Sequence, residues 1–318
     1  MRLGIRLCHA IGFYYINFST MIYLLLSVFF SILLLINFRL HTRFGINTFQ
    51  AIILNYPVCF LTGLYFLPDN QHFNLNFSEP STPWAMLLGV GFVITFLLSG
   101  ASTQKVGITA TSLANNISLV IPVIFSLVVL KSSQSFDFWN FLGLGLALVA
   151  VVLSTLKKEE KSETQIKNTS DWLLPIAVFV MYGITNTTFN FLNAKYVTAS
   201  GNTIPFTLTI LTGSIIFGSI VLIIRVLQGK ESLQLKNLWA AFPLGIPNFL
   251  SFYFLLKALD TFQNNGAFVL PIYNISVILG SAIIALIFFQ EKLSTLNKVG
   301  LTLAVLAIGL ISYQGIFA

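Results

Sequence analysis

Charged residues divide the chain into ten long segments that carry no charge in their interiors. Each segment is near or above the roughly 20 residues that an α-helix needs to cross the hydrocarbon core of a bilayer. A backbone in lipid has to satisfy its own hydrogen bonds, and the segments do not alternate as barrel strands would. The pattern predicts membrane-spanning helices at 21–38, 47–67, 83–104, 108–130, 138–156, 172–194, 203–227, 237–257, 264–289 and 298–316.

The composition supports a surface that faces lipid. Apolar residues make up 56% of the chain and charged residues 8%, and the mean hydropathy is +0.86. A soluble domain carries about 25% charged residues, so this chain has too few to cover a water-facing surface. We therefore expect an all-α integral membrane protein with ten transmembrane helices.

Lysine and arginine are distributed unevenly among the expected loops. The loops after the first, third, fifth, seventh and ninth helices hold 12 of them, and those after the second, fourth, sixth and eighth hold 3. The positive-inside rule places the first set of loops in the cytoplasm and both termini outside. These residues stand singly at helix ends and form no basic stripe, so the net charge of +7 does not indicate nucleic-acid binding.

The chain is organised as two similar halves. An N-terminal lead, 1–20, precedes a first repeat, 21–156, and a polar cytoplasmic linker, 157–171, separates it from a second repeat, 172–316. Short matches recur in the same order in both halves: Leu61-Thr62-Gly63 with Leu211-Thr212-Gly213, Asn116-Ile117-Ser118 with Asn274-Ile275-Ser276, and Gly143 with Gly300. Because five is an odd number of crossings, the second half enters the membrane inverted. Inverted repeats are typical of alternating-access carriers, which bind substrate at the repeat interface.

A small set of residues carries a resemblance to a known family: Pro122, Gly143, Ala258, Asn274, Gln290-Glu291-Lys292-Leu293 and Gly300. With these residues and its two five-helix halves, the region 21–316 resembles the drug/metabolite transporter superfamily of the EamA type. The resemblance implies a ten-helix transporter fold and leaves the substrate open. Gln134 departs from the pattern, which has glutamate there. The smallest members of the superfamily exchange protons on a glutamate of the first helix, and that helix has no acid here.

Prolines are expected to interrupt several helices. Each proline lacks an N–H group and leaves the carbonyl four residues earlier without its helical donor. Pro122 predicts a bend in the fourth helix. Pro243 and Pro247, with Gly245 between them, predict an irregular eighth helix.

Reactive groups are scarce in the expected spans. All ten carboxylates lie at helix ends or in loops, and the three histidines, His41 among them, lie outside the spans. Cys8 and Cys59 are too few for a disulfide framework or a metal site. Phosphate-binding loops and catalytic pairs are missing from the sequence. We therefore predict no enzyme, no cofactor and no metal, and transport that does not depend on an embedded carboxylate.

Neutral polar residues gather in three of the expected helices. The candidate substrate-binding residues are Asn115 and Asn116 in the fourth helix, Asn186 and Asn190 in the sixth, and Tyr273 and Asn274 in the ninth. Ser99 and Thr103 in the third helix are candidates for a further wall of the site. The offset between the halves pairs Asn115 with Tyr273 and Asn116 with Asn274 across the repeat axis. Amides also join packed membrane helices, which they stabilise by about 0.6 kcal/mol on average, so each asparagine has a packing alternative.

These patterns favour a secondary transporter in the inner membrane of the cell. Asparagine and tyrosine offer donors and acceptors without charge, which suits a small polar metabolite that is neutral or zwitterionic, such as an amino acid. A flippase for a lipid-linked group in the same fold is the alternative. The expected partners are the small-molecule substrate and the lipid bilayer, not nucleic acid, and the expected assembly is a monomer or a homodimer.

Overall fold

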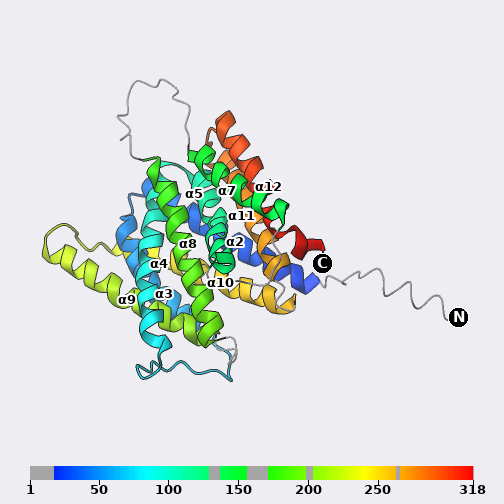
Figure 1. The fold of residues 1–318 in the computed structure, drawn as a ribbon. Coiled ribbons are helices and arrows are strands. Elements are labelled where there is room, and N and C mark those ends of the chain that lie inside the picture. Colours follow the sequence, from blue (N-terminus) through cyan, green and yellow to red (C-terminus); the bar gives the residue numbers. More distant parts are fainter. Residues whose placement is uncertain (1–17, 129–136, 156–170, 198–202, 263–265, 318) are drawn as a thin grey trace, which may run out of the picture.

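The computed structural model describes residues 18–128, 137–155, 171–197, 203–262 and 266–317, and within these ranges the chain is helical and contains no strand (Figure 1). The helices are α2 Phe18–Arg43, α3 Thr48–Tyr65, α4 Ser81–Lys105, α5 Ile108–Ile117, α6 Val120–Val128, α7 Phe138–Thr155, α8 Leu173–Tyr196, α9 Thr203–Leu227, α10 Leu235–Thr261, α11 Gly266–Phe288 and α12 Thr295–Phe317. The predicted lead, 1–20, lies almost wholly outside these ranges, and so does the predicted linker, 157–171, apart from Asp171.

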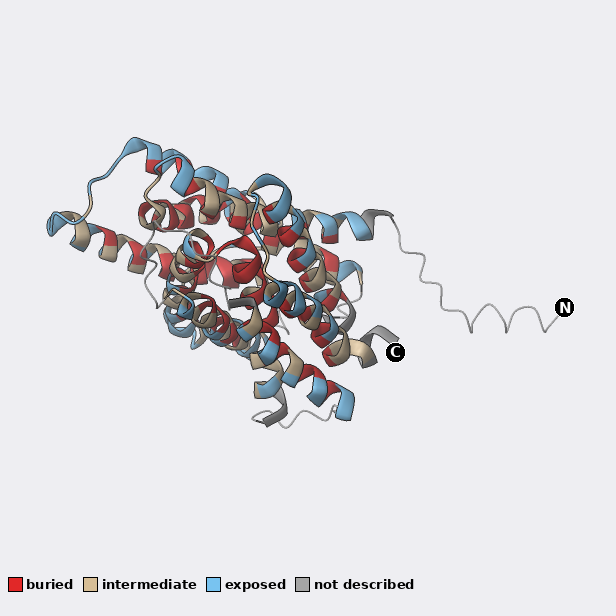
Figure 2. Cartoon of the chain, turned by 90° about the horizontal axis from the view of Figure 1, so that it is seen from above, coloured by how far each residue is buried: buried red, intermediate tan, exposed pale blue. Residues whose placement is uncertain are grey.

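Eight helical segments of the described chain are long and apolar enough to cross a membrane. One of them, Ile108–Phe125, runs through α5 into α6, and α7 contributes a further, shorter apolar stretch at Phe138–Leu153. Figure 2 shows buried residues in the interior of the bundle and exposed ones around its outside. Large apolar side chains such as Phe29 and Ile223 are among those exposed, at 54% and 56%. A water-soluble monomer rarely exposes so much apolar surface, so the chain is a multi-pass membrane protein.

Close helix pairs hold the bundle together. Helix α4 packs along α8 and α9, and α10 packs along α2 and α3, while α5 packs on α11 and α7 on α12. Glycines permit two of these approaches. A Cβ on Gly213 would lie 2.2 Å from the Met86 carbonyl oxygen, and one on Gly245 would lie 2.6 Å from that of Asn55. In lipid, small residues of this kind let backbones come close enough for dispersion contacts to hold helices together.

The break between α5 and α6 confirms the predicted bend in the fourth helix. Because Pro122 has no N–H group, the Ser118 carbonyl accepts the Ile121 N–H instead, at 3.0 Å. The prediction of an irregular eighth helix is wrong, since α10 continues through Pro243 and Pro247. Pro247 frees the carbonyl of Pro243, and the Asn37 side-chain amide of α2 donates to it at 2.9 Å. A neighbouring helix thus satisfies the group that the proline leaves without a donor.

One end of the bundle, which we call the linker face, carries Arg39, Lys105, Glu231 and Glu291. The Arg39 guanidinium donates to the Gln104 carbonyl at 2.8 Å, which joins the ends of α2 and α4. Lys105 forms an ion pair with Asp171 at 3.0 Å. These contacts bring together the junctions that the charge count predicts to share one side of the membrane.

The linker face also joins the α2–α3 turn to the α9–α10 turn. Glu231 accepts the side-chain amides of Asn47 at 2.6 Å and Gln50 at 2.8 Å. At the opposite face, the Tyr313 hydroxyl of α12 donates to Asp137, which precedes α7. The start of α2 and the end of α12 lie near one another on one side of the bundle (Figure 1).

The structure corrects the placement of His41. Helix α2 continues to Arg43, beyond its predicted end, and His41 lies in its last turn with only 2% of its surface exposed. Its Nδ1 atom lies 3.2 Å from the Thr48 hydroxyl of α3. The side chain is buried because the ends of α2, α3 and α4 pack together at the linker face.

Candidate functional site

The structure places the two asparagines of the fourth helix beside the break between α5 and α6. Asn116 is 5% exposed, and its amide donates to the Ser112 carbonyl of its own helix at 2.7 Å. Asn115 is half-buried, and its carbonyl accepts the Ser118 hydroxyl at the break. Discontinuous helices are a recurrent feature of transporter binding sites. The local bond of Asn116 fits the packing alternative, whereas the contact of Asn115 with Ser118 is made by its backbone carbonyl.

Tyr273 and Asn274 lie on α11, the helix that packs on α5. The hydroxyl groups of Tyr273 and Ser31 lie 2.7 Å apart, so α11 is joined to α2 in the interior of the bundle. Asn274 is 9% exposed. The contact between α5 and α11 is made in part by the Ser112 hydroxyl, which donates to the Val277 carbonyl at 3.4 Å.

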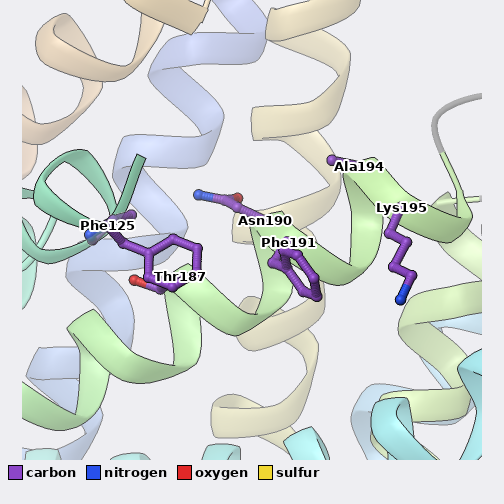
Figure 3. A pocket seen from close by; sticks show the side chains of 7 residues that line it. Phe125, Thr187, Asn190, Phe191, Ala194 and Lys195 are labelled. Atoms are coloured by element: carbon purple, nitrogen blue, oxygen red, sulfur yellow. The ribbon is translucent and has the colours of Figure 1, made fainter. Parts of the chain in front are cut away.

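Asn186 and Asn190 lie on an exposed side of α8. Asn190 lines a pocket of about 480 Å³ between α6 and α8, together with Pro122, Phe125, Thr187, Phe191, Ala194 and Lys195. Figure 3 shows Phe125 of α6 close to Thr187 of α8, with the Asn190 amide and the Lys195 amine pointing in different directions. The pocket lies at the flank of the bundle, and it does not bring Asn186 and Asn190 into contact with the α5–α11 pair.

A second set of polar groups lies in the interior, and the sequence pointed to only two of its members, Tyr273 and Ser99. We call it the hydroxyl cluster: Ser31 of α2, Tyr56 of α3, Ser99 of α4, Tyr182 of α8 and Tyr273 of α11. The Tyr182 side chain lies near Tyr56 on one side and near Tyr273 on the other. Five helices, three from the N-terminal half and two from the C-terminal half, therefore bring hydroxyl side chains to one region.

Two members of the cluster have unused hydrogen-bonding capacity. Tyr56 and Ser99 are each 1% exposed, and neither hydroxyl has a hydrogen-bond partner of good geometry among the described residues. The Tyr182 hydroxyl lies beside Ser99. A buried polar group without a partner costs about 1–3 kcal/mol, so such groups are uncommon unless they have a role. These two hydroxyls are the strongest candidates for direct contact with a polar ligand.

The cluster contains no charged side chain. Tyrosine and serine hydroxyls both donate and accept, and the cluster is surrounded by aromatic rings such as Phe96, whose centroid lies 6.2 Å from that of Tyr56. A site of this composition can bind polar groups through hydrogen bonds and apolar groups against the rings. It cannot balance a lone charge, which in lipid needs an opposite charge or a polar cavity.

The sequence contained a weak signal for the missed residues. Tyr56 and Tyr182 interrupt apolar runs, but tyrosine is also common at the outside of membrane helices. A water-soluble helix shows its buried face through its apolar stripe. These helices are apolar on both sides because lipid replaces water, so the sequence does not indicate which side chains point inward.

Comparisons with known proteins support the fold and leave the activity open. No family model matches the chain. An uncharacterized protein of Haemophilus influenzae is 26% identical over 269 residues, which cover 83% of this chain and 88% of that protein. A crystal structure of another protein matches 93% of this chain and 98% of its own, with a TM-score of 0.56 and 13% identity. At this identity the likeness concerns the fold alone.

Proposed function

We propose that the chain is a secondary transporter that moves a small polar solute, neutral or zwitterionic, across the inner membrane by alternating access. In this proposal the α5–α6 segment counts as one interrupted span. The bundle then has ten spans arranged as two inverted halves, 21–156 and 172–316, with the linker in the cytoplasm. The proposal agrees with the resemblance of the sequence to EamA-type transporters.

The packing of the helices supports an inverted repeat. In an inverted repeat, α2, α3 and α4 of the first half correspond to α8, α9 and α10 of the second half. A two-fold rotation then maps the contacts of α4 with α8 and α9 onto the contacts of α10 with α2 and α3. Both sets of contacts are present. The same operation relates α5 with α11 and α7 with α12, and each of these pairs is in contact. The axis would pass between α5 and α11, where carriers of this type bind their substrates.

The single observation that carries the proposal is the buried hydroxyl of Tyr56, which has no hydrogen-bond partner among the described residues, next to that of Ser99, whose neighbour Tyr182 forms no bond of good geometry with it. They come from two helices of one half, and Tyr182 and Tyr273 face them from the other half. A solute that bonds with Tyr56 and Ser99 would stabilise the protein by supplying the missing partners. Asn115, at the interrupted helix, and Asn274 are proposed to complete the site.

Alternating access needs the two halves to expose the hydroxyl cluster to each face in turn. A neutral or zwitterionic solute suits the absence of charge among the cluster side chains. The described carboxylates lie at helix ends and junctions, so the solute would move without protonation of a side chain at mid-depth.

The test combines ligand binding with removal of single hydroxyls. Purified protein is screened by thermal shift against amino acids, sugars, nucleosides and organic acids, and the solutes that stabilise it are followed by uptake into proteoliposomes. Tyr56→Phe and Ser99→Ala should melt at the parent temperature or above it, because each removes an unsatisfied group, but they should lose the stabilisation by solute. Tyr65→Phe is the matched control, since Tyr65 lies on the same helix and is 84% exposed. The proposal would be contradicted if Tyr56→Phe and Ser99→Ala melted at lower temperatures than the parent but took up the solute at the parent rate.

A flippase for a lipid-linked group is the second candidate, and the pocket between α6 and α8 favours it. The pocket opens at the flank of the bundle, where a lipid chain has direct access, and Lys195 lies at its end. Proteoliposomes that contain a fluorescent lipid-linked sugar distinguish the two candidates. Transfer of that lipid between leaflets, lost in Asn190→Ala and Lys195→Ala but retained in Tyr56→Phe, would favour the flippase.

A further inference from the structure

Glu291 makes a three-part contact with a helix from the other half of the chain. Its Oε1 atom accepts the Ile108 N–H at 2.7 Å, and its Oε2 atom accepts the Thr109 N–H at 3.3 Å and the Thr109 hydroxyl at 3.2 Å. Ile108 and Thr109 are the first residues of α5 and are 0% and 4% exposed. The carboxylate therefore takes the place of the side-chain cap that this helix does not receive from Gly107.

The backbone on both sides of the contact is shaped for it. Glu291 follows α11, and its own N–H bonds back to the Ala285 carbonyl at 3.0 Å. Gln290 has φ of 50°, an uncommon value for a residue with a side chain, and it turns the chain so that Glu291 can make this bond. Gly107 has φ of 131°, and a Cβ at that position would lie 2.8 Å from Oε1 of Glu291. The carboxylate occupies the space that a side chain at position 107 would need.

The contact is electrostatically favourable and joins the two halves at one place. The free N–H groups and the dipole at a helix N-terminus attract a negative charge, and burial strengthens hydrogen bonds to an ionised group. Glu291 belongs to the second half and α5 to the first. The contact lies at the linker face, at one end of the packed α5–α11 pair.

We propose that Glu291 is a positioning residue that holds the linker face closed in this conformation. The α11–α12 junction stays on the first turn of α5 while the carboxylate is bonded there. The hydroxyl cluster becomes accessible from the linker face when the carboxylate leaves α5 and the two helices separate. This inference rests on the proposed function, because a bundle that does not transport has no need to open at this point.

The test uses a cysteine directly behind the contact. Ser112 lies one turn into α5, is 0% exposed and bonds to the Val277 carbonyl of α11, so it becomes accessible only when α5 and α11 separate. Ser112→Cys is made in full-length protein in which Cys8 and Cys59 are replaced by alanine. The rate of reaction with a membrane-impermeant thiol reagent is measured from each face in vesicles of known orientation.

Glu291→Gln should raise the labelling rate from the linker face by about tenfold, which lies within the usual range of coupling between two conformations. The amide of glutamine donates, so it cannot replace both carboxylate oxygens as acceptors for Ile108 and Thr109. The matched control is Asp137→Asn, an acid-to-amide change at a helix start on the opposite face, and its labelling rate should equal that of the parent.

Two results would overturn the inference. The first is an unchanged labelling rate in Glu291→Gln. The second is an equal increase from both faces together with a lower melting temperature, which would show general loosening of the bundle. Failure of the proposed function is distinguishable from both, because it would appear as a parent protein that takes up none of the solutes while the labelling still depends on Glu291.

Discussion

Two carboxylates, Asp137 and Glu291, bond to the first N–H groups of a helix, but they reach the helix by different routes. Asp137 directly precedes α7 and accepts the N–H groups of Trp139 at 3.0 Å and Asn140 at 3.2 Å. Glu291 is more than 180 residues from α5 in the sequence and reaches it from the other half of the chain. Asp137 also accepts the Tyr313 hydroxyl of α12, so both carboxylates link the halves, at opposite faces.

The difference concerns what each carboxylate holds in place. Asp137 remains beside α7 whatever the two halves do, because only its bond to Tyr313 depends on the other half. Every bond that Glu291 makes with α5 depends on the closed arrangement of the linker face. A cap that comes from its own helix stabilises local structure, whereas a cap that comes from another half stabilises one conformation of the whole bundle.

The largest expected effect is that of Glu291→Ala on stability. The change leaves the buried N–H groups of Ile108 and Thr109 without acceptors, and each unsatisfied group costs about 1–3 kcal/mol, so we expect a loss of about 3 kcal/mol in this conformation. Asp137→Ala should lose less, because Trp139 is 52% exposed and its N–H lies near the water-facing end of α7. Thermal unfolding in detergent measures both, and equal losses would show that the origin of the cap has no effect.

The second largest loss of stability is expected for Gly107→Ala. An alanine at φ of 131° is strained, and its Cβ would displace the Glu291 carboxylate, so we expect a loss of about 2 kcal/mol. Gly229→Ala is the control, because Gly229 has φ of 68° with open space around it, and the φ value alone costs about 1 kcal/mol. Equal melting temperatures for Gly107→Ala and Gly229→Ala would show that a Cβ at position 107 does not displace the Glu291 carboxylate.

A smaller difference in stability is expected when each of the two carboxylates is replaced by the corresponding amide. Asparagine is as good an N-cap as aspartate, so Asp137→Asn should retain most of the stability that Asp137→Ala loses. Glutamine at position 291 cannot accept from both N–H groups of α5, so Glu291→Gln should lose nearly as much as Glu291→Ala. The melting temperatures of these four variants test the expected order of stability. If Glu291→Gln melted at the parent temperature, the Glu291 contact would not depend on two carboxylate oxygens.

The smallest effect is a pH dependence at Asp137. The hydrogen bond from Tyr313, supported by backbone N–H groups, lowers the pKa of Asp137 below its ordinary value of 3.8. A lowered pKa in the folded protein means stability that is present above 3.8 and is lost as the pH falls through the lowered pKa. The difference in melting temperature between the parent and Asp137→Ala should therefore stay constant from neutral pH to about pH 5 and narrow in stronger acid. A difference that widens in acid would contradict this sign.

The local features of the fold could be predicted from the sequence. Charge-free segments predicted the helices because the cost of burying charge in lipid acts on each segment separately. Pro122 predicted the break between α5 and α6 for a local reason, its missing N–H group. Pro243 and Pro247 did not break α10, because Asn37 from a distant segment satisfies the freed carbonyl, and no local rule contains that contact.

The candidate site was predictable only in part. Tyr273 was found because it lies beside the repeated Asn-Ile-Ser motif, and the structure places it against Ser31. Tyr56 and Tyr182 were missed, because the lipid-facing and inward-facing sides of these helices are both apolar and the inward side is not marked. Glu291 was visible as the acid that closes the ninth helix, but its bond to α5 depends on how the two halves pack.

Accessibility of a cysteine at position 99 tests the proposed transport most directly, since Ser99 is a buried member of the hydroxyl cluster. Ser99→Cys, in protein in which Cys8 and Cys59 are replaced by alanine, is exposed to a membrane-impermeant thiol reagent from each face in separate experiments. Alternating access predicts labelling from both faces, with slower labelling from the linker face and an increase at that face in Glu291→Gln. Complete protection from both faces, in the parent and in Glu291→Gln, would show a sealed core and contradict the account.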